Sequence, residues 1–376
     1  MIYLDSAATS FQKPDSVGRA MTRALETLSS PGRGGYAAAM AAADTALTCR
    51  TELQELFHAS EPEQVIFTMN ATHALNLAIK STVPRGGRVV ISGYEHNAVT
   101  RPLRALEAGV TVAQGGLFRP DEAAEAFRKA VKPGLDAVIC NHVSNVFGFA
   151  QPIEKIAGIC REQGVPLIVD ASQSAGVLPV DIQALGAAFV AMPGHKGLFG
   201  PQGTGVLVCG AGTDTRPLLE GGTGSLSWQQ EMPDFLPDRL EAGTHNMPGI
   251  AGLLAGVRFV RERGLPAICA EERRLAALAA AVLRDLPGIE VFAEPDLFAQ
   301  TGVLSFRSRG MDSEELAAAL AERDIAVRAG LHCAPLAHES AGTLKTGTVR
   351  ISFSPFNTRE EVFRLASAVE VAAKRM

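Results

Sequence analysis

Several features that would assign this chain to a special class of protein are missing from its 376 residues. Lys and Arg are scattered and the net charge is −5, whereas nucleic-acid binding requires a basic patch or stripe. No apolar run approaches the roughly 20 residues that span a bilayer. The sequence therefore predicts neither a nucleic-acid partner nor a membrane partner.

Paired cysteines are missing as well. The six cysteines are widely spaced and form no C-x-x-C pair, so neither a disulfide framework nor a metal site is expected. Several stand in apolar runs such as AVICN and VLVCG, where a thiol packs as a small core residue. The first residues, MIYLDSAATS, lack the basic and apolar regions of a secretory signal. We therefore expect a reducing, cytoplasmic location.

The sequence does contain a regular alternation of short apolar runs with helical patterns between about residues 60 and 210. QVIFT precedes the helical ATHALNLAIK, for example, and RVVIS precedes NAVTRPLRALEA. Strands that are apolar on both faces and alternate with helices predict an α/β fold with a mostly parallel, fully covered sheet. Ligands of such sheets bind beyond the carboxyl ends of the strands.

The remainder of the chain follows a different pattern. Residues 211–249 are rich in Gly, Pro and Thr and predict a long irregular segment, which in a compact protein is usually functional. Two helical patterns follow, and the tail alternates strands and helices up to a predicted helix at 358–375. We expect this tail to form a second, smaller α+β domain.

Two charged residues follow predicted strands: Asp170 in PLIVDAS and Lys196 in FVAMPGHKG. Both side chains could face one pocket, and one known use of such a pair is a pyridoxal phosphate site. There the lysine forms a Schiff base and the acid holds the proton of the pyridinium. On the residues alone, Asp170 could also be a helix cap or loop ion pair, and Lys196 a surface lysine.

Two other strand ends carry polar groups. FTMNATHALN predicts a strand that runs into a helix whose first turn contains Ala71 and Thr72, and free amides there suit a phosphate. His96 in ISGYEHNAV could stack on an aromatic ring and exchange protons near neutral pH. The alternative is a loop histidine beside a helix cap.

Cys333 lies outside the apolar runs, in VRAGLHCAPLAHES. Arg328 and His332 precede it, and positive neighbours stabilise a thiolate, although an inert half-buried thiol remains an alternative. Arg350 stands mid-strand in GTVRISFS and always carries its charge. An anion should meet it, either a substrate carboxylate or an internal acid.

Taken in order, seven motifs resemble the class V pyridoxal-phosphate enzymes of the aminotransferase superfamily: YLDSAATS, FTMNATHALNLAI, EHNAV, VDASQSAG, GHKGLFGPQGTG, RLEAGTHN and RAGLHCAP. Within that superfamily the chain is most similar to cysteine desulfurases with a short active-site cysteine loop. The resemblance implies fold type I, with a mostly parallel seven-stranded sheet between helices in a large domain at 14–262. Residues 1–13 and 263–376 would form the small α+β domain.

The resemblance also implies a role for each matching residue. Lys196 would form the Schiff base with pyridoxal 5'-phosphate, Cys333 would accept the sulfur, and His96 would stack on the ring and act as an acid. Thr244 would reach the phosphate of a partner subunit, which implies a homodimer. The other implied contacts are Asp170 to the ring nitrogen, Gln173 to the phenolic oxygen, Asn145 beside it, Ala71, Thr72 and His195 to the phosphate, and Arg350 with Arg328 to the substrate carboxylate.

Three residues depart from the family pattern. Pro193 stands where a serine is usual and offers the phosphate neither a hydroxyl nor an amide. Asn70 replaces a glycine of the phosphate turn, and His245 replaces a proline after EAGT. At least one phosphate contact must therefore come from elsewhere.

The activity implied is that of a pyridoxal-phosphate-dependent cysteine desulfurase, a sulfurtransferase. It would convert L-cysteine to L-alanine and hold the sulfur as a persulfide on Cys333, for transfer to an acceptor protein such as an iron–sulfur cluster assembly scaffold. A non-catalytic scaffold for partner proteins that keeps the cofactor pocket stays open as an alternative, and so do two other activities. One is a selenocysteine lyase acting on L-selenocysteine, and the other is a class V transaminase or β-lyase in which Cys333 is incidental.

Overall fold

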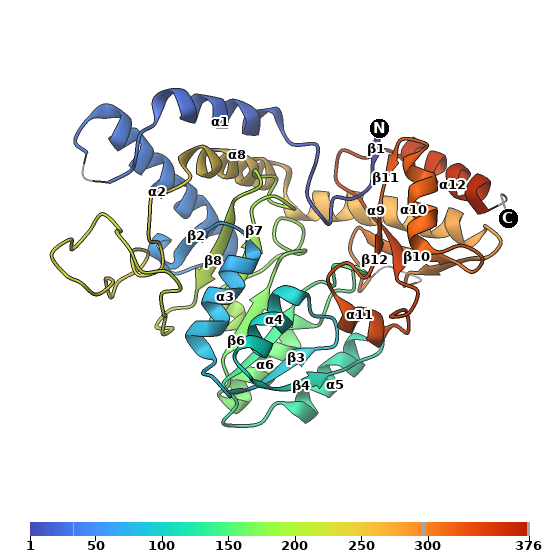
Figure 1. The fold of residues 1–376 in the computed structure, drawn as a ribbon, viewed down its shortest axis with the longest axis horizontal. Coiled ribbons are helices and arrows are strands. Elements are labelled where there is room, and N and C mark those ends of the chain that lie inside the picture. The colour runs from blue at the N-terminus through green and yellow to red at the C-terminus, as the bar shows by residue number, and fades with distance from the viewer. Residues whose placement is uncertain (33, 295–297, 374–376) are drawn as a thin grey trace.

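The computed structural model describes residues 1–32, 34–294 and 298–373. Figure 1 shows two parts side by side, one around a large sheet and one containing both the N-terminal strand and the C-terminal helix. No helix among the described residues is long and apolar enough to cross a membrane.

The large sheet has seven strands in the order β2-β8-β7-β6-β5-β3-β4. Neighbouring strands from β7 to β4 are parallel, whereas β8 is antiparallel to both of its neighbours. The mostly parallel α/β sheet expected from the sequence is thus confirmed. Its strands are β2 (Val65–Thr68), β3 (Arg88–Ser92), β4 (Gly109–Ala113), β5 (Ala137–Asn141), β6 (Leu167–Asp170), β7 (Phe189–Pro193) and β8 (Gly205–Cys209).

Alternate residues of these strands enter two different cores, as the two-sided apolar pattern requires. Val190 and Met192 pack into one, and Phe189 and Ala191 into the other. The helices around this sheet are α1 (Asp15–Thr27), α2 (Ala37–Phe57), α3 (Ala71–Thr82), α4 (Asn97–Ala105), α5 (Pro120–Ala130), α6 (Ile153–Gln163), α7 (Ile182–Leu185) and α8 (Met247–Arg263), with a 3-10 turn at Pro62–Gln64. Helices α3 and α4 cover one face, whereas α2, α6 and α8 contribute to the core on the other.

The second part is built on an antiparallel sheet of four strands in the order β12-β13-β10-β9. A separate pair, β1 with β11, brings the first residues of the chain beside it, so that Ile2 and Leu4 enter its core. The elements of this part are β1 (Ile2–Tyr3), α9 (Leu265–Arg284), β9 (Ile289–Phe292), β10 (Val303–Ser308), α10 (Ser313–Ala321), β11 (Ile325–Ala326), β12 (Arg328–Gly330), α11 (Pro335–Ser340), β13 (Thr348–Ser352) and α12 (Arg359–Ala373). The domain boundaries 14–262 and 1–13 with 263–376 stay a prediction.

Some elements were not foreseen from the sequence. Helices α1, α2 and α11 are new, and the strand expected at 325–330 is divided between β11 and β12, which belong to different sheets. No helix or strand interrupts residues 211–246, as expected for the Gly- and Pro-rich segment. The helix predicted at 358–375 is α12, and its last predicted positions lie outside the described residues.

Candidate active site

Asp170 and Lys196 lie at the same edge of the large sheet. Strand β6 ends at Asp170, whose neighbour on β7 is Ala191, and Lys196 follows the end of β7 by three residues. Asp170 is buried, and its Oδ1 accepts a hydrogen bond from the Ser172 amide at 2.9 Å. The carboxylate is therefore fixed in place at the carboxyl end of a central strand, where α/β sheets bind ligands.

The Lys196 amine is easier to deprotonate than a solvated lysine. Burial lowers its pKa to about 8, the positive Arg350 adds to this effect, and Asp170 and Asp5 act against it. Because only the neutral amine is a nucleophile or a base, this environment prepares Lys196 for covalent or proton-transfer chemistry at near-neutral pH. The Schiff-base role that the family resemblance implies for Lys196 stays a prediction.

The start of helix α3 provides an anion site. Asn70 is the N-cap, and its side chain accepts from the His73 amide at 2.9 Å. The amides of Ala71 and Thr72 have no hydrogen-bond partner among the described residues, and the Thr72 side chain is exposed. Two free amides and the positive end of a helix of 12 residues suit a phosphate. Asn70, a departure from the family pattern, thus stabilises this helix start.

His195 holds the N-terminal segment against the turn that contains Lys196. Its Nδ1 lies 3.0 Å from the Thr9 hydroxyl oxygen, and its carbonyl accepts from the Ser10 amide at 2.9 Å. Burial lowers the pKa of His195 to about 4, so the imidazole is neutral. It can therefore donate one hydrogen bond to a phosphate oxygen but adds no charge.

His96 is the N-cap of α4. Its Nδ1 accepts from the Ala98 amide at 3.0 Å, so the neutral ring carries its proton on Nε2. Burial is the main cause that lowers its pKa, and the Asp170 charge acts against it. His96 can therefore be both a helix cap and a proton donor, because Nδ1 caps the helix and Nε2 remains available for proton transfer.

Arg350 meets an internal acid that the sequence did not single out. Its Nη2 donates to Asp5 Oδ1 at 2.8 Å, and Arg328 Nη2 donates to Asp5 Oδ2 at 2.9 Å. Two guanidinium groups thus share one carboxylate, which leaves one excess positive charge for an incoming anion. The Nε of Arg350 is buried without a hydrogen-bond partner among the described residues.

The loop that carries Cys333 is fastened to the large part. The Cys333 carbonyl accepts from the Asn97 amide at 2.7 Å, and the His332 carbonyl accepts from Asn145 Nδ2 at 2.8 Å. These two bonds place the backbone of Cys333 next to Asn97, the residue that follows His96, and the Cys333 side chain is exposed. The loop that carries Cys333 is thereby held beside His96 and Asn145.

One expectation about this loop was wrong. His332 was expected to be a positive neighbour of the thiol, but burial lowers its pKa to about 2, so its imidazole is neutral. Arg328 remains as a cation close enough to interact electrostatically with Cys333. The charge of a loop histidine depends on burial, which its sequence neighbours do not reveal.

Gln173 and Lys196 line a small cavity of about 40 Å³ at the junction of the two parts. The Gln173 amide donates to the Ala7 carbonyl at 2.9 Å, which leaves its second N–H free. Asn145 also has capacity left, because its Oδ1 is buried with no partner in the described structure. Both amides can therefore still bind a ligand.

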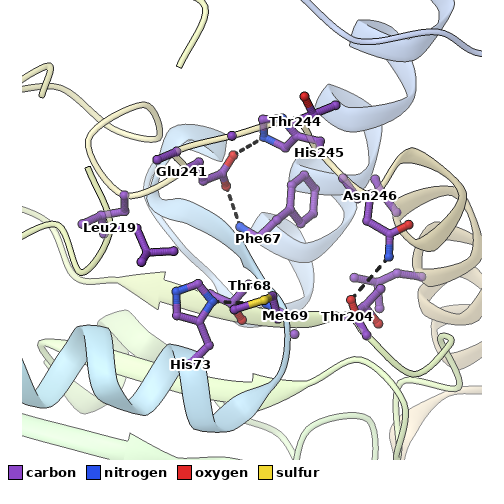
Figure 2. A pocket seen from close by; sticks show the side chains of 17 residues that line it. Phe67, Thr68, Met69, His73, Thr204, Leu219, Glu241, Thr244, His245 and Asn246 are labelled. Atoms are coloured by element: carbon purple, nitrogen blue, oxygen red, sulfur yellow. Dashed lines mark hydrogen bonds and ion pairs between the residues drawn. The ribbon is translucent and has the colours of Figure 1, made fainter. Parts of the chain in front are cut away.

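Thr244 lies in a different cavity, of about 230 Å³, together with Met69 and His73 (Figure 2). Its side chain is exposed, and Lys196 does not line this cavity. The expected contact of Thr244 with a partner's phosphate stays a prediction. Within the described chain, the structure does not bring Thr244 to the residues around Lys196.

The segment before Thr244 is anchored by a buried ion cluster, part of which is drawn in Figure 2. Arg50 and Glu241 form a buried ion pair at 2.5 Å, and His245 Nε2 lies 2.6 Å from Glu241 Oε2. The Phe67 amide also donates to Glu241. His245, where the family pattern has proline, therefore helps to fix the irregular segment to β2 and α2.

Glu95 is a second functional candidate that the sequence analysis missed. It is fully buried, and burial raises its pKa to about 8. Ser92 Oγ lies 2.5 Å from Glu95 Oε1 and 2.8 Å from Asn141 Oδ1, yet a hydroxyl has one proton. A protonated Glu95 that donates to Ser92 satisfies both contacts. The signals that could have revealed Glu95 and Asp5 are an acid beside His96 and an acid directly after the apolar IYL.

The sequence of this chain matches a known protein family over nearly its whole length. A family model described as aminotransferase class-V matches residues 2–365. The chain belongs to this family. Among its curated relatives is a probable cysteine desulfurase of Methanothermobacter thermautotrophicus, 34% identical and aligned over 99% of this chain and 94% of that protein.

Solved class-V structures agree in fold. An apo cysteine desulfurase from Thermococcus onnurineus superposes with a TM-score of 0.89 at 30% identity, covering all of this chain and 95% of that one. A cysteine desulfurase from Escherichia coli gives 0.86 at 28% identity, covering 100% and 95%. The fold is thus that of the pyridoxal-phosphate enzymes of fold type I.

Pyridoxal 5'-phosphate is the cofactor of the class-V family, and the residues present fit it. Lys196 supplies a buried amine of lowered pKa, and Asp170 a fixed carboxylate. The unused amides of Ala71 and Thr72 suit its phosphate. Pro193 adds nothing to that phosphate site.

Proposed function

We propose that this chain is a pyridoxal-phosphate-dependent cysteine desulfurase, which takes the sulfur of L-cysteine onto Cys333 and releases L-alanine. The observation that carries the proposal is the position of Cys333 in the fold. Cys333 is the exposed cysteine of the six, and its carbonyl is hydrogen-bonded to the residue that follows His96. A thiol fixed beside the cofactor residues can reach the side chain of a bound amino acid.

The residues divide the work as follows. Arg350, whose Nε is unpaired, binds the substrate carboxylate, with Arg328 nearby. The neutral form of Lys196 accepts the Cα proton, and Asp170 stabilises a proton on the ring nitrogen of the cofactor. When bound, the cofactor supplies an electron sink for the pair released at Cα.

Cys333 then completes the reaction. Its thiolate attacks the substrate sulfur, an S–S bond forms, and the Cβ–S bond breaks. The carbon fragment keeps the electron pair of that bond and takes up a proton, and Nε2–H of His96 is placed to donate one. Lys196 returns its proton to Cα, alanine leaves and Cys333 holds a persulfide, so sulfur is oxidised as carbon is reduced and no outside oxidant is required.

Other parts of the proposal concern binding and partners. Ala71, Thr72 and His195 bind the phosphate, Gln173 the phenolic oxygen, and Asn145 the cofactor edge. A homodimer would bring Thr244 of the second subunit to the phosphate. The persulfide is passed on to an acceptor, which could be a scaffold for iron–sulfur assembly, a thiolation enzyme or a small thiol, in a reducing, cytoplasmic setting.

The test is Cys333→Ala in cofactor-loaded protein. The variant should take up pyridoxal phosphate as the wild type does, because Cys333 is not among the cofactor contacts. Alanine formation from L-cysteine should fall by about a hundredfold or more, since the attacking nucleophile is lost. Mass spectrometry of the wild type should show one added sulfur atom on Cys333.

The same assay distinguishes the alternatives. Release of sulfide and alanine by Cys333→Ala at the wild-type rate would remove the thiol from the mechanism. A keto acid in place of alanine would indicate a transaminase or β-lyase. Turnover of L-selenocysteine that persists in the variant while L-cysteine turnover is lost would indicate a selenocysteine lyase, because selenolate is the better leaving group.

A further inference from the structure

A closed ring of hydrogen bonds joins the Cys333 loop to the two arginines. His332 Nε2 lies 3.4 Å from the Arg328 carbonyl, and the Arg328 guanidinium donates to Asp5. Asp5 accepts from Arg350, and Arg350 Nη1 donates to the Asn145 carbonyl at 2.9 Å. Asn145 Nδ2 returns to the His332 carbonyl. The residue before the thiol is thus connected to the arginine that meets the substrate carboxylate.

A second set of hydrogen bonds, a relay from His332 through His338 to Thr343, supports this closed ring of hydrogen bonds. His332 Nδ1 lies 3.3 Å from His338 Nε2, and His338 Nδ1 lies 2.8 Å from the Thr343 hydroxyl oxygen. The two imidazole planes are nearly parallel, at an angle of 12° with centroids 5.6 Å apart, and the rings meet edge to edge; His338 and Thr343 are completely buried. Burial lowers the pKa of His338 to about 4, so both rings are neutral at physiological pH.

The proton positions in this relay follow from its ends. The Arg328 carbonyl can only accept, so His332 Nε2 carries the proton and Nδ1 accepts. His338 Nε2–H must then donate to His332, its Nδ1 must accept, and the Thr343 hydroxyl must donate to it. Every ring nitrogen is satisfied in this one arrangement. The Arg328 carbonyl therefore fixes the tautomer of both histidines, and the Thr343 hydroxyl satisfies the last ring nitrogen.

The backbone at the thiol requires this support. His332 and Cys333 have φ of 52° and 55°, two consecutive left-handed residues of which neither is glycine. Each costs about 1 kcal/mol or more relative to an ordinary conformation, and such strain persists only where surrounding contacts determine the conformation. In this loop those contacts are the ring, the relay and the bond from the Asn97 amide.

We propose that His338 and Thr343 are positioning residues, which hold Cys333 in its strained conformation at a fixed place relative to Arg350. The inference rests on the proposed function, since the place that matters is where the substrate sulfur lies once its carboxylate is bound. Neither residue touches substrate or cofactor; both act through His332. A shift of about 1 Å in a reacting group can lower a rate about a hundredfold.

The experiment compares Thr343→Val, which removes the hydroxyl, with Thr343→Ser, which keeps it, and His338→Phe, which keeps an aromatic ring but removes both nitrogens. His58→Ala serves as a control, because His58 is exposed and its ion-pair partner is Asp181, outside this loop. Hydrogen exchange of the cofactor-loaded proteins is followed at the amides of Asn97 and Ala334, which bond to this loop. Strand β10 serves as the internal reference.

We expect exchange at these two amides to become about tenfold or more faster in Thr343→Val and His338→Phe, while β10 stays unchanged. With L-cysteine, kcat should fall about tenfold to a hundredfold with KM within about twofold. Elimination of chloride from L-β-chloroalanine needs no thiol nucleophile and should be retained. Thr343→Ser and His58→Ala should behave as the wild type.

Unchanged exchange in both Thr343→Val and His338→Phe would overturn the proposal. An equal loss on L-cysteine and L-β-chloroalanine would also overturn it, because the residues would then act on the whole site. The exchange measurement needs no turnover. If the wild type fails to release alanine from L-cysteine, the proposed function fails, and the exchange data still decide whether His338 and Thr343 hold the loop.

Discussion

The two side chains that we propose to react, Lys196 and Cys333, are prepared in opposite ways. Lys196 follows a central strand of a rigid sheet, and burial lowers its pKa to about 8. Cys333 lies on an exposed loop in a strained conformation, and hydrogen bonds of neighbouring side chains hold it. The protein thus tunes the protonation of its amine by desolvation and fixes the position of its thiol by directional bonds.

The largest effect on activity is expected from replacing Lys196. Lys196→Ala should lower turnover of both L-cysteine and L-β-chloroalanine by about a thousandfold or more, since it removes the amine that binds the cofactor and the base at Cα. Borohydride reduction followed by mass spectrometry should label wild-type Lys196 and leave the variant without label. Lys129→Ala, at an exposed lysine, is the control. Equal labelling of both variants would contradict the assignment.

A smaller effect on activity is expected at Asp5, which pairs with both Arg350 and Arg328. Asp5→Asn should raise KM for L-cysteine about tenfold, because Arg350 and Arg328 lose the charge that aligns them. Breaking this buried contact should also lower the free energy of unfolding by about 3 kcal/mol. Initial rates and urea unfolding measure the two changes. Asp15→Asn, at an exposed acid, should change neither, and an unaltered KM in Asp5→Asn would show that Asp5 does not align the arginines.

The smallest effect, on the pH dependence of stability, is expected for Glu95, whose pKa is shifted by burial as that of Lys196 is. Its pKa is raised from 4.5 to about 8, so the native state binds this proton more tightly than the unfolded chain does. Its contribution to stability is complete at pH values below about 4.5 and is lost as the pH rises toward 8. Glu95→Gln removes this dependence, so its stability relative to wild type should increase from pH 5 to pH 8.

Thermal or urea unfolding at several pH values measures this trend. Glu95→Ala should lower the free energy of unfolding by about 2 kcal/mol at pH 6, because the contacts of Ser92 and Asn141 with this carboxyl are lost. A difference between Glu95→Gln and wild type that does not change with pH would mean that Glu95 does not titrate in this window.

The sequence predicts the Lys196 side better than the Cys333 side. Strands β6 and β7 are short apolar runs, and parallel strands end at one edge, so the sequence alone could place Asp170 and Lys196 together. The motif order then indicated the family. Helices α1 and α2 were missed although their own sequences favour helix, since α1 is amphipathic and α2 is rich in Ala and Leu. The division of residues 325–330 between two sheets depends on packing between distant segments, which the local sequence does not show.

The contacts around Cys333 could not be predicted for a related reason. Asp5 and Arg350 are separated by 345 positions, and nothing local to either residue indicates the other. The neutral state of His332 follows from burial, which the neighbouring loop sequence does not reveal. Side-chain networks between distant segments arise only in the folded chain.

The burial of five cysteines and the exposure of the sixth have a practical consequence. One addressable thiol per chain means that a maleimide titration of the folded protein counts reactive centres directly, without substitution of the other five. For the proposed reaction it also limits each subunit to one persulfide, on Cys333. A disulfide-trapped acceptor recovered from cells would therefore report its docking position unambiguously, at residue 333.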